Sequence, residues 1–196
     1  MRTLMIVVGA PGPNSVGFAV GQWVEHEARH SDEFSIDLVK LGELNLPFAE
    51  DAPLRDESGK SSHARAWAAR VAAADAVIVV TAEYTRGASP MLLSALGCLD
   101  REWSCKPIGL VTYAGISGGA GATAALAPTL FALGAIGVHE RVELPHAERQ
   151  IIDGVFYSEA DQVIALTAQL VQLRDVTDAL RRPAFADTQA PTARVS

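Results

Sequence analysis

The chain has 196 residues, of which 49% are hydrophobic, and its formal net charge is −7. This length and composition predict one soluble domain with a full core, and no apolar run approaches the length of a membrane span. The acidic balance, without any Lys/Arg cluster, argues against a nucleic-acid partner. The two cysteines, Cys98 and Cys105, are too far apart for CxxC chemistry, so we expect reduced, buried thiols in a cytoplasmic protein rather than a disulfide.

Five short runs of apolar residues, most of them rich in β-branched side chains, predict strands. They cover residues 4–8, 34–39, 76–80, 108–113 and 136–144. The second run alternates apolar and polar residues, as an edge strand does. The first run is too short for the apolar core of a signal peptide, and Pro11 and Pro13 follow it closely.

Helices are expected between these strands. The first has Val16, Val20 and Trp23 near helical spacing on one face. The others are expected to run through 67–71 and over about 89–102, 122–133 and 158–182. Pro128 should kink the fourth helix or mark a later start, and Pro183 should end the last one.

Strands and helices alternate along the whole chain, which predicts an α/β fold with a doubly wound, five-stranded parallel sheet. Five strands suit the flavodoxin-like order 2-1-3-4-5. We expect a single domain over residues 1–182 and a disordered tail over 183–196. The long acidic excursion after the second strand should be ordered over 44–48 and mobile after Asp51.

In this strand order, three loops meet at the carboxyl edge of the sheet. The first loop (residues 9–17) opens a helix and can offer backbone N–H groups to a phosphate. The second loop (81–89) offers Glu83, Tyr84 and Thr85, and the third loop (114–121) has glycines that would let a flat ligand approach the backbone. One phosphate loop and two ring loops describe a mononucleotide site, such as one for FMN.

Simpler interpretations remain open for each loop. The first loop could be only a tight turn between strand and helix, Tyr84 could simply pack, and Glu83 could cap the next helix. Residues 119–124, GAGATA, fit a dinucleotide fingerprint, but that fingerprint belongs to the first turn of its domain. No Walker lysine follows a glycine loop, and Ser117 has no GxSxG frame. The histidines and cysteines lack metal-ligand spacing, so we expect surface histidines and no metal site.

Four segments together resemble one family. GAPGPNSVGFAVGQWV (9–24) matches a GSTRPGRxGxxVAxWV-type opening without gaps, and LGELNLPFAED (41–51) is similar to an acidic Leu-Pro segment. AAADAVIVVTAEYT (72–85) and YAGISGGAGATAAL (113–126) are similar to ADxxxxxxPEYN and YGGxSGGxxAxxxL. Residues 3–174 thus resemble the NADPH-dependent FMN reductases, which include quinone and azo-dye reductases. The resemblance implies a flavodoxin-like fold, bound FMN, and electrons passing from NAD(P)H to a quinone-like or other small-molecule acceptor. It also implies homodimers or homotetramers.

The resemblance also implies a cofactor site. The phosphate would lie on Ala10, Gly12, Ser15 and Val16. The ring would lie against the second and third loops and the strand ends that precede them, at Ala82, Glu83, Tyr84, Thr85, Tyr113, Gly115, Ser117, Gly118 and Gly119. The cofactor carries the chemistry, so no catalytic acid or base is assigned.

The chain departs from the family pattern at several positions. Gly12 and Ser15 stand where the opening loop usually has arginines, and Ala82 and Thr85 replace the proline and asparagine of PEYN. These changes support an alternative function, a non-catalytic flavodoxin-like descendant that binds another ligand or a protein partner. The helix after Pro90 is apolar on most faces, which predicts cover from a second copy of the chain.

Overall fold

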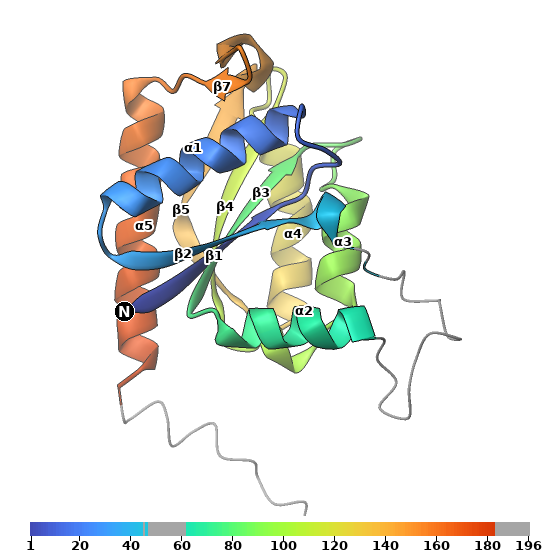
Figure 1. Cartoon of the computed structure of the whole chain (residues 1–196), viewed down its shortest axis with the longest axis vertical. Coiled ribbons are helices and arrows are strands. Elements are labelled where there is room, and N and C mark those ends of the chain that lie inside the picture. The colour runs from blue at the N-terminus through green and yellow to red at the C-terminus, as the bar shows by residue number, and fades with distance from the viewer. Residues whose placement is uncertain (45, 47–61, 183–196) are drawn as a thin grey trace, which may run out of the picture.

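The computed structural model describes residues 1–44, 46 and 62–182. The expected tail, and most of the acidic excursion with its expected change from order to mobility, lie outside the described residues. The strands form one parallel sheet in the order β2-β1-β3-β4-β5, which confirms the predicted topology (Figure 1). Their bounds are Arg2–Val8 (β1), Phe34–Lys40 (β2), Ala76–Ala82 (β3), Pro107–Ala114 (β4) and Ile136–Pro145 (β5).

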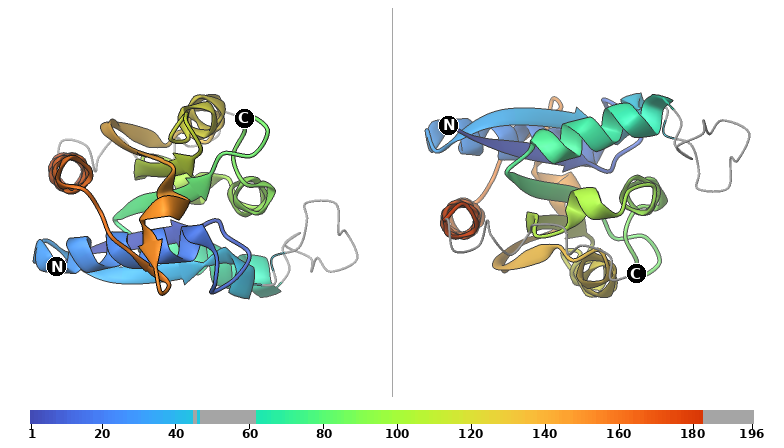
Figure 2. Two further views of the ribbon diagram at one scale, coloured as in Figure 1. Left: turned by 90° about the horizontal axis from the view of Figure 1, so that it is seen from above. Right: turned by 90° about the horizontal axis from the view of Figure 1, so that it is seen from below.

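Helices cover both faces of the sheet (Figure 2). The side chains packed on one face belong to α1 (Val16–His30) and α5 (Ala160–Leu180). Those on the other face belong to α2 (Ser62–Ala73), α3 (Pro90–Gly97) and α4 (Ala120–Ala132). Every residue of the central strand β3 is buried, as its unbroken apolar run predicts. Residues alternate between exposed and partly buried along much of the edge strand β5.

Helix α3 ends at Gly97, earlier than the expected end near 102. Two buried indoles bind the last turn of the helix. Trp67 Nε1 donates to the Ala95 carbonyl at 2.9 Å, and Trp103 Nε1 donates to the Leu96 carbonyl at 3.1 Å. These carbonyls belong to the last turn of the helix, and the Leu99 amide also donates to the Leu96 carbonyl at 3.3 Å. A short 3-10 turn, Arg101–Trp103, replaces the predicted helical continuation.

Helix α4 begins at Ala120, two residues earlier than expected, and continues through Pro128. Of the two expected effects of Pro128, a kink or a later start, the later start is therefore excluded. Gly119 precedes the helix with a φ of 100°, a left-handed conformation that glycine adopts without strain. Pro128 is exposed, so its ring projects from the solvent side of the helix.

A small hairpin after β5 was not predicted. It pairs β6 (Ile151–Ile152) with β7 (Val155–Phe156) and follows a 3-10 turn over Ala147–Gln150. The turn residues Asp153 and Gly154 both have positive φ. An Asp-Gly pair between apolar residues is a strong hairpin signal, so the sequence did contain this element.

The prediction for the two cysteines also needs a partial correction. Cys98 and Cys105 do not form a disulfide, and both are only partly buried, whereas buried thiols were expected. Cys105 lies in the turn before β4 with a φ of 57°. Four of the histidines are exposed and His146 is half-buried.

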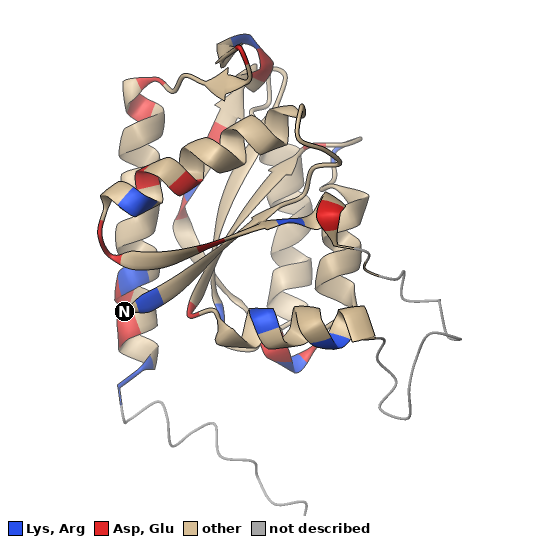
Figure 3. Ribbon diagram, viewed as in Figure 1, with Lys and Arg blue, Asp and Glu red and all other residues tan. Residues whose placement is uncertain are grey.

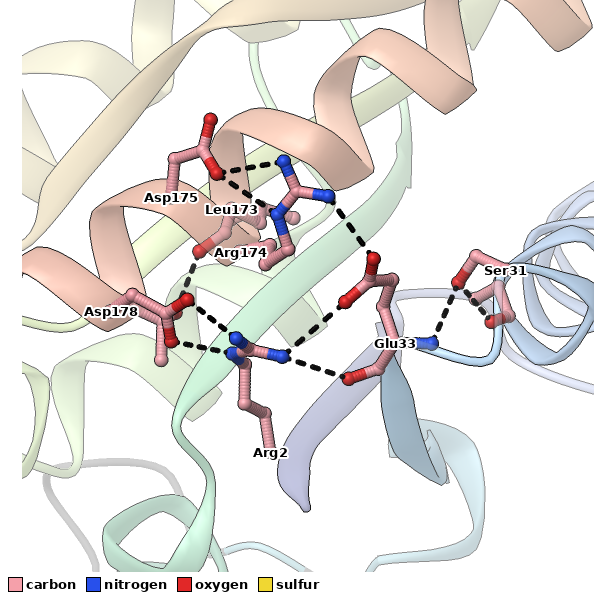
Figure 4. Close-up of polar contacts among 9 residues, drawn as sticks. Arg2, Ser31, Glu33, Leu173, Arg174, Asp175 and Asp178 are labelled. Atoms are coloured by element: carbon pink, nitrogen blue, oxygen red, sulfur yellow. Dashed lines mark hydrogen bonds and ion pairs between the residues drawn. The ribbon is translucent and has the colours of Figure 1, made fainter.

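The edge of the sheet opposite the predicted site is held by ion pairs (Figure 4). Arg2 on β1 binds Asp178 of α5, with Nε 2.7 Å from Oδ1. Glu33, just before β2, accepts from Arg2 at 3.4 Å and from Arg174 at 3.1 Å. The hydrogen bond from Arg2 is the main cause of a lowered pKa at Asp178. These contacts fasten α5 to the starts of β1 and β2.

Candidate functional site

The structure brings the three predicted loops together at the carboxyl edge of the sheet. The amide of Gly9 donates to the Val80 carbonyl at 2.9 Å, which joins the first loop to the end of β3. The amide of Glu83 donates to the Tyr113 carbonyl at 2.9 Å, which joins the second loop to the end of β4. This is the edge where ligands bind in open α/β sheets.

The first loop is organised by Ser15, the N-cap of α1. Its hydroxyl accepts from the Phe18 amide at 3.2 Å and donates to the Gly12 carbonyl at 2.6 Å. The hydroxyl is therefore already engaged within the loop. Among the described residues, the amides of Gly12 and Asn14 have no hydrogen-bond partner. Free amides before a helix N-terminus suit an anion, so the loop fits a phosphate through its backbone.

Glu83 joins the second and third loops. Its Oε2 accepts from the Ser117 hydroxyl at 2.9 Å and from the Gly121 amide at 2.8 Å. Glu83 therefore caps α4 rather than the next helix along the chain, α3. A carboxylate at a helix N-terminus is stabilised by the free amides and the helix dipole. The carboxylate holds the two expected ring loops in one position.

The tip of the second loop is a tight turn in a strained conformation. Tyr84 and Gly87 exchange backbone hydrogen bonds of 2.8 and 2.7 Å. The two residues between them, Thr85 and Arg86, have φ values of 49° and 64°. Side chains rarely adopt this left-handed region, and a β-branched residue such as threonine does so least readily. The turn leaves the Tyr84 ring 48% exposed at the mouth of the site.

The glycines of the third loop divide into two groups. Gly118 and Gly119 are buried at positive φ, and a Cβ on Gly119 would lie 2.4 Å from the Thr112 Cβ. These two glycines thus allow the backbone to pack against β4. Gly115 and Ser117 are exposed and accessible to a ligand.

Three residues of the predicted set are largely internal. Ala10 and Ala82 are buried at the ends of β1 and β3, and Tyr113 is 8% exposed beneath α1. The Tyr113 hydroxyl forms a hydrogen bond with the Gly17 backbone. Burial, together with nearby Tyr84, raises the Tyr113 pKa well above its ordinary value, so the phenol stays protonated.

A cavity of about 400 Å³ opens beside the first and second loops. Pro11, Tyr84 and Ser89 line it together with residues that were not predicted, namely Leu41, Gly42, Leu44, Leu46, Pro90, Met91 and Ser94. A Cβ on Gly42 would lie 2.8 Å from the Pro11 carbonyl oxygen, so only glycine lets this segment pack so closely. The volume and the mostly apolar walls suit a small planar ligand.

Other features of the described residues lie apart from this edge. A groove of about 470 Å³ between α1 and the hairpin is lined by Trp23, Phe156 and Tyr157 and by none of the predicted site residues. No group of three potential metal ligands occurs in the described part of the chain. No described helix has the length and apolarity needed to cross a membrane.

Comparisons with known proteins agree with this geometry. The family described as NADPH-dependent FMN reductase matches residues 1–149. An NAD(P)H-dependent FMN reductase of Nectria is 27% identical, over 93% of this chain and 99% of that protein. One from Schizosaccharomyces pombe is 26% identical over 59% of this chain, and the match spans 60% of that protein.

Among solved structures, the fold is similar to FerB of Paracoccus denitrificans, a flavoenzyme NAD(P)H:(acceptor) oxidoreductase. The TM-score is 0.74 at 21% identity, over 91% of this chain and 98% of that one. The apo form of the NADH:FMN oxidoreductase EMOB has a TM-score of 0.65 at 16% identity, over 97% of this chain and 100% of that one. The family match confirms the predicted flavodoxin-like fold and the predicted class of oxidoreductase that uses FMN and NAD(P)H. With the sequence resemblance, the strand order and the family match in agreement, this chain is a member of the NADPH-dependent FMN reductase family.

Proposed function

We propose that this protein is an FMN-dependent oxidoreductase that takes electrons from NAD(P)H and passes them to a quinone-like or other small acceptor. The observation that carries the proposal is the position of two features at one sheet edge. A loop with free amides lies beside a cavity of about 400 Å³ with apolar walls, as a phosphate joined to a planar ring requires. Relatives named as NAD(P)H-dependent FMN reductases support it.

The chain's own residues would bind and orient the reactants. Bound FMN supplies the hydride chemistry, because no side chain of a protein can do so. Gly12 and Asn14 would donate amides to its phosphate. Glu83 would keep the second and third loops in place beside the ring, and the exposed Tyr84 would cover it. Leu41, Leu46 and Met91 would exclude water from the cavity.

Flavin content and turnover test this proposal. The protein is purified, its visible spectrum is recorded, and flavin released by denaturation is measured by fluorescence. The apoprotein is then titrated with FMN and assayed with NADH or NADPH and 1,4-benzoquinone. We expect FMN uptake and quinone-dependent oxidation of at least one nicotinamide. A colourless protein that takes up no FMN would instead support the alternative, a flavodoxin-like descendant with another ligand or partner.

We also propose a homodimer, or a tetramer built from it. Most apolar side chains of α3 are covered within the chain, but Leu93 on α3 is 42% exposed and Phe131 on α4 is 86% exposed. Neither helix has a charged residue, in contrast to α1, α2 and α5 (Figure 3). An exposed, uncharged surface of two helices favours cover by another protein surface. Cys98 and Cys105 do not form a disulfide, which supports a reducing, cytoplasmic setting.

A further inference from the structure

The first loop contains no basic residue, because Gly12 and Ser15 occupy the positions of the family's arginines. Ser15 cannot compensate, since its hydroxyl is engaged with the Phe18 amide and the Gly12 carbonyl. Backbone amides alone would have to neutralise a phosphate. Sites for phosphate monoesters usually add a cationic side chain.

Lys40 places a cation beside this loop from a different strand. It is the last residue of β2, and the parallel register pairs it with Val8, where β1 enters the first loop. Its Nζ lies 4.5 Å from the centroid of the Phe18 ring, in the first turn of α1. This cation–π contact ties the ammonium to the start of the helix that follows the loop.

A small cavity joins Lys40 to the loop. Its volume is about 140 Å³, and it is lined by Pro11, Gly12 and Pro13 together with Phe18, Lys40 and Glu43. One water occupies about 30 Å³ in the liquid, so the cavity has room for a phosphate group. Glu43 Oε1 is 3.3 Å from Lys40 Nζ, and the Glu43 side chain is 68% exposed. The Lys40 ammonium is therefore paired with the Glu43 carboxylate, which is exposed enough to move into solvent.

We propose that Lys40 supplies the positive charge for the nucleotide phosphate that the first loop lacks, and that Glu43 competes with this phosphate for the Lys40 ammonium. The inference rests on the proposed function and names a specificity-determining residue of that site. An ammonium on a flexible four-carbon stem acts as a point charge and needs no fixed bidentate geometry. We assign Lys40 to the phosphate monoester of FMN; the 2′-phosphate of NADPH has the same chemistry, and the experiment separates the two.

The test uses the full-length apoprotein and its variants Lys40→Met, Lys40→Arg and Glu43→Gln. Each is titrated with FMN and with riboflavin, which lacks the phosphate, by quenching of flavin fluorescence. NADPH and NADH are titrated in parallel. Arg29→Met is the matched control, because Arg29 is an exposed cation elsewhere on α1 and its loss changes the net charge equally. Thermal unfolding shows whether each variant is folded.

Lys40→Met should weaken FMN binding about tenfold, or about 1.4 kcal/mol, and leave riboflavin unchanged. Lys40→Arg should retain most of the FMN affinity, and Glu43→Gln should increase it several-fold. Added salt should reduce all of these differences. Arg29→Met should change the affinity for neither FMN nor riboflavin.

Other outcomes overturn the inference. If wild type prefers FMN over riboflavin and Lys40→Met keeps that preference, Lys40 does not face the phosphate, although the proposed function stands. The same conclusion follows if Lys40→Met weakens both flavins equally. If Lys40→Met weakens the binding of NADPH but not of NADH or FMN, Lys40 belongs to the dinucleotide site, and its assignment to FMN is overturned. If wild type binds neither flavin, the proposed function and this inference both fail.

Discussion

Replacing Ser15 by arginine restores a residue type that the family usually has in the phosphate loop. The structure shows two opposing consequences. The variant loses the N-cap of α1, because arginine cannot accept from the Phe18 amide as the serine hydroxyl does. Loss of such a cap costs about 1 kcal/mol, which lowers the melting temperature of a domain of this size by about 2–4 °C.

The same variant gains a planar fork of donors for a phosphate. A hydrogen bond between charged groups contributes about 1.5–3 kcal/mol, and side-chain ordering in a partly exposed loop should reduce this to about 1 kcal/mol. We therefore expect FMN binding to become several-fold tighter in a less stable apoprotein. Riboflavin binding should not change, and the FMN gain should shrink as salt is added.

The assay is titration of wild type and variant with FMN and riboflavin, together with thermal unfolding of the apoproteins. Ser15→Ala is the matched control, since it also removes the cap but adds no charge. It should lose similar stability without any gain in FMN affinity. If Ser15→Arg binds FMN no more tightly than wild type, or if its affinity rises equally for FMN and riboflavin, Ser15 does not face a phosphate. The placement of FMN on the first loop is then wrong.

Gln169 is completely buried, and its Nε2 donates to the Leu110 and Glu140 carbonyls. Gln169→Leu should therefore lower the free energy of unfolding, measured by urea titration, by about 2–3 kcal/mol. Gln22→Leu, at an exposed position, should have little effect. An unchanged urea midpoint in Gln169→Leu would show that these carbonyls find other partners. In sedimentation experiments, Phe131→Glu should convert the dimer to a monomer. Ile164→Glu, on the exposed face of α5, should leave the dimer intact. A wild-type protein that is monomeric at all concentrations would exclude the proposed assembly. The lowered pKa of Asp178 means that its contribution to stability is present above its unfolded pKa and is lost as the pH falls through the lower folded pKa. Asp178→Asn should therefore be less stable than wild type at about pH 7, and thermal melts should show this difference shrinking as the pH falls through the folded pKa; a constant difference across pH would contradict this reasoning.

The architecture, and the edge of the sheet at which the three loops meet, can be predicted from the sequence alone. Runs of β-branched residues such as residues 76–80 mark strands through local periodicity alone, and their alternation with helices leaves few possible topologies. Parallel strands place their carboxyl ends at one edge, so the meeting of the three loops followed from strand order. The Asp153–Gly154 hairpin also belongs here, because its turn signal is local even though it was not used.

The side chains that meet at that edge, by contrast, are set by tertiary packing. Glu83 caps α4 through Gly121, 38 residues further on, and Trp67 and Trp103 donate to carbonyls in the last turn of α3. Lys40 reaches the first loop because the β1–β2 register sets it beside Val8. Such pairings depend on how helices and loops are positioned over a twisted sheet. Local propensity and periodicity specify which elements form, but not which side chains far apart in the chain become neighbours, because that depends on packing of the whole core.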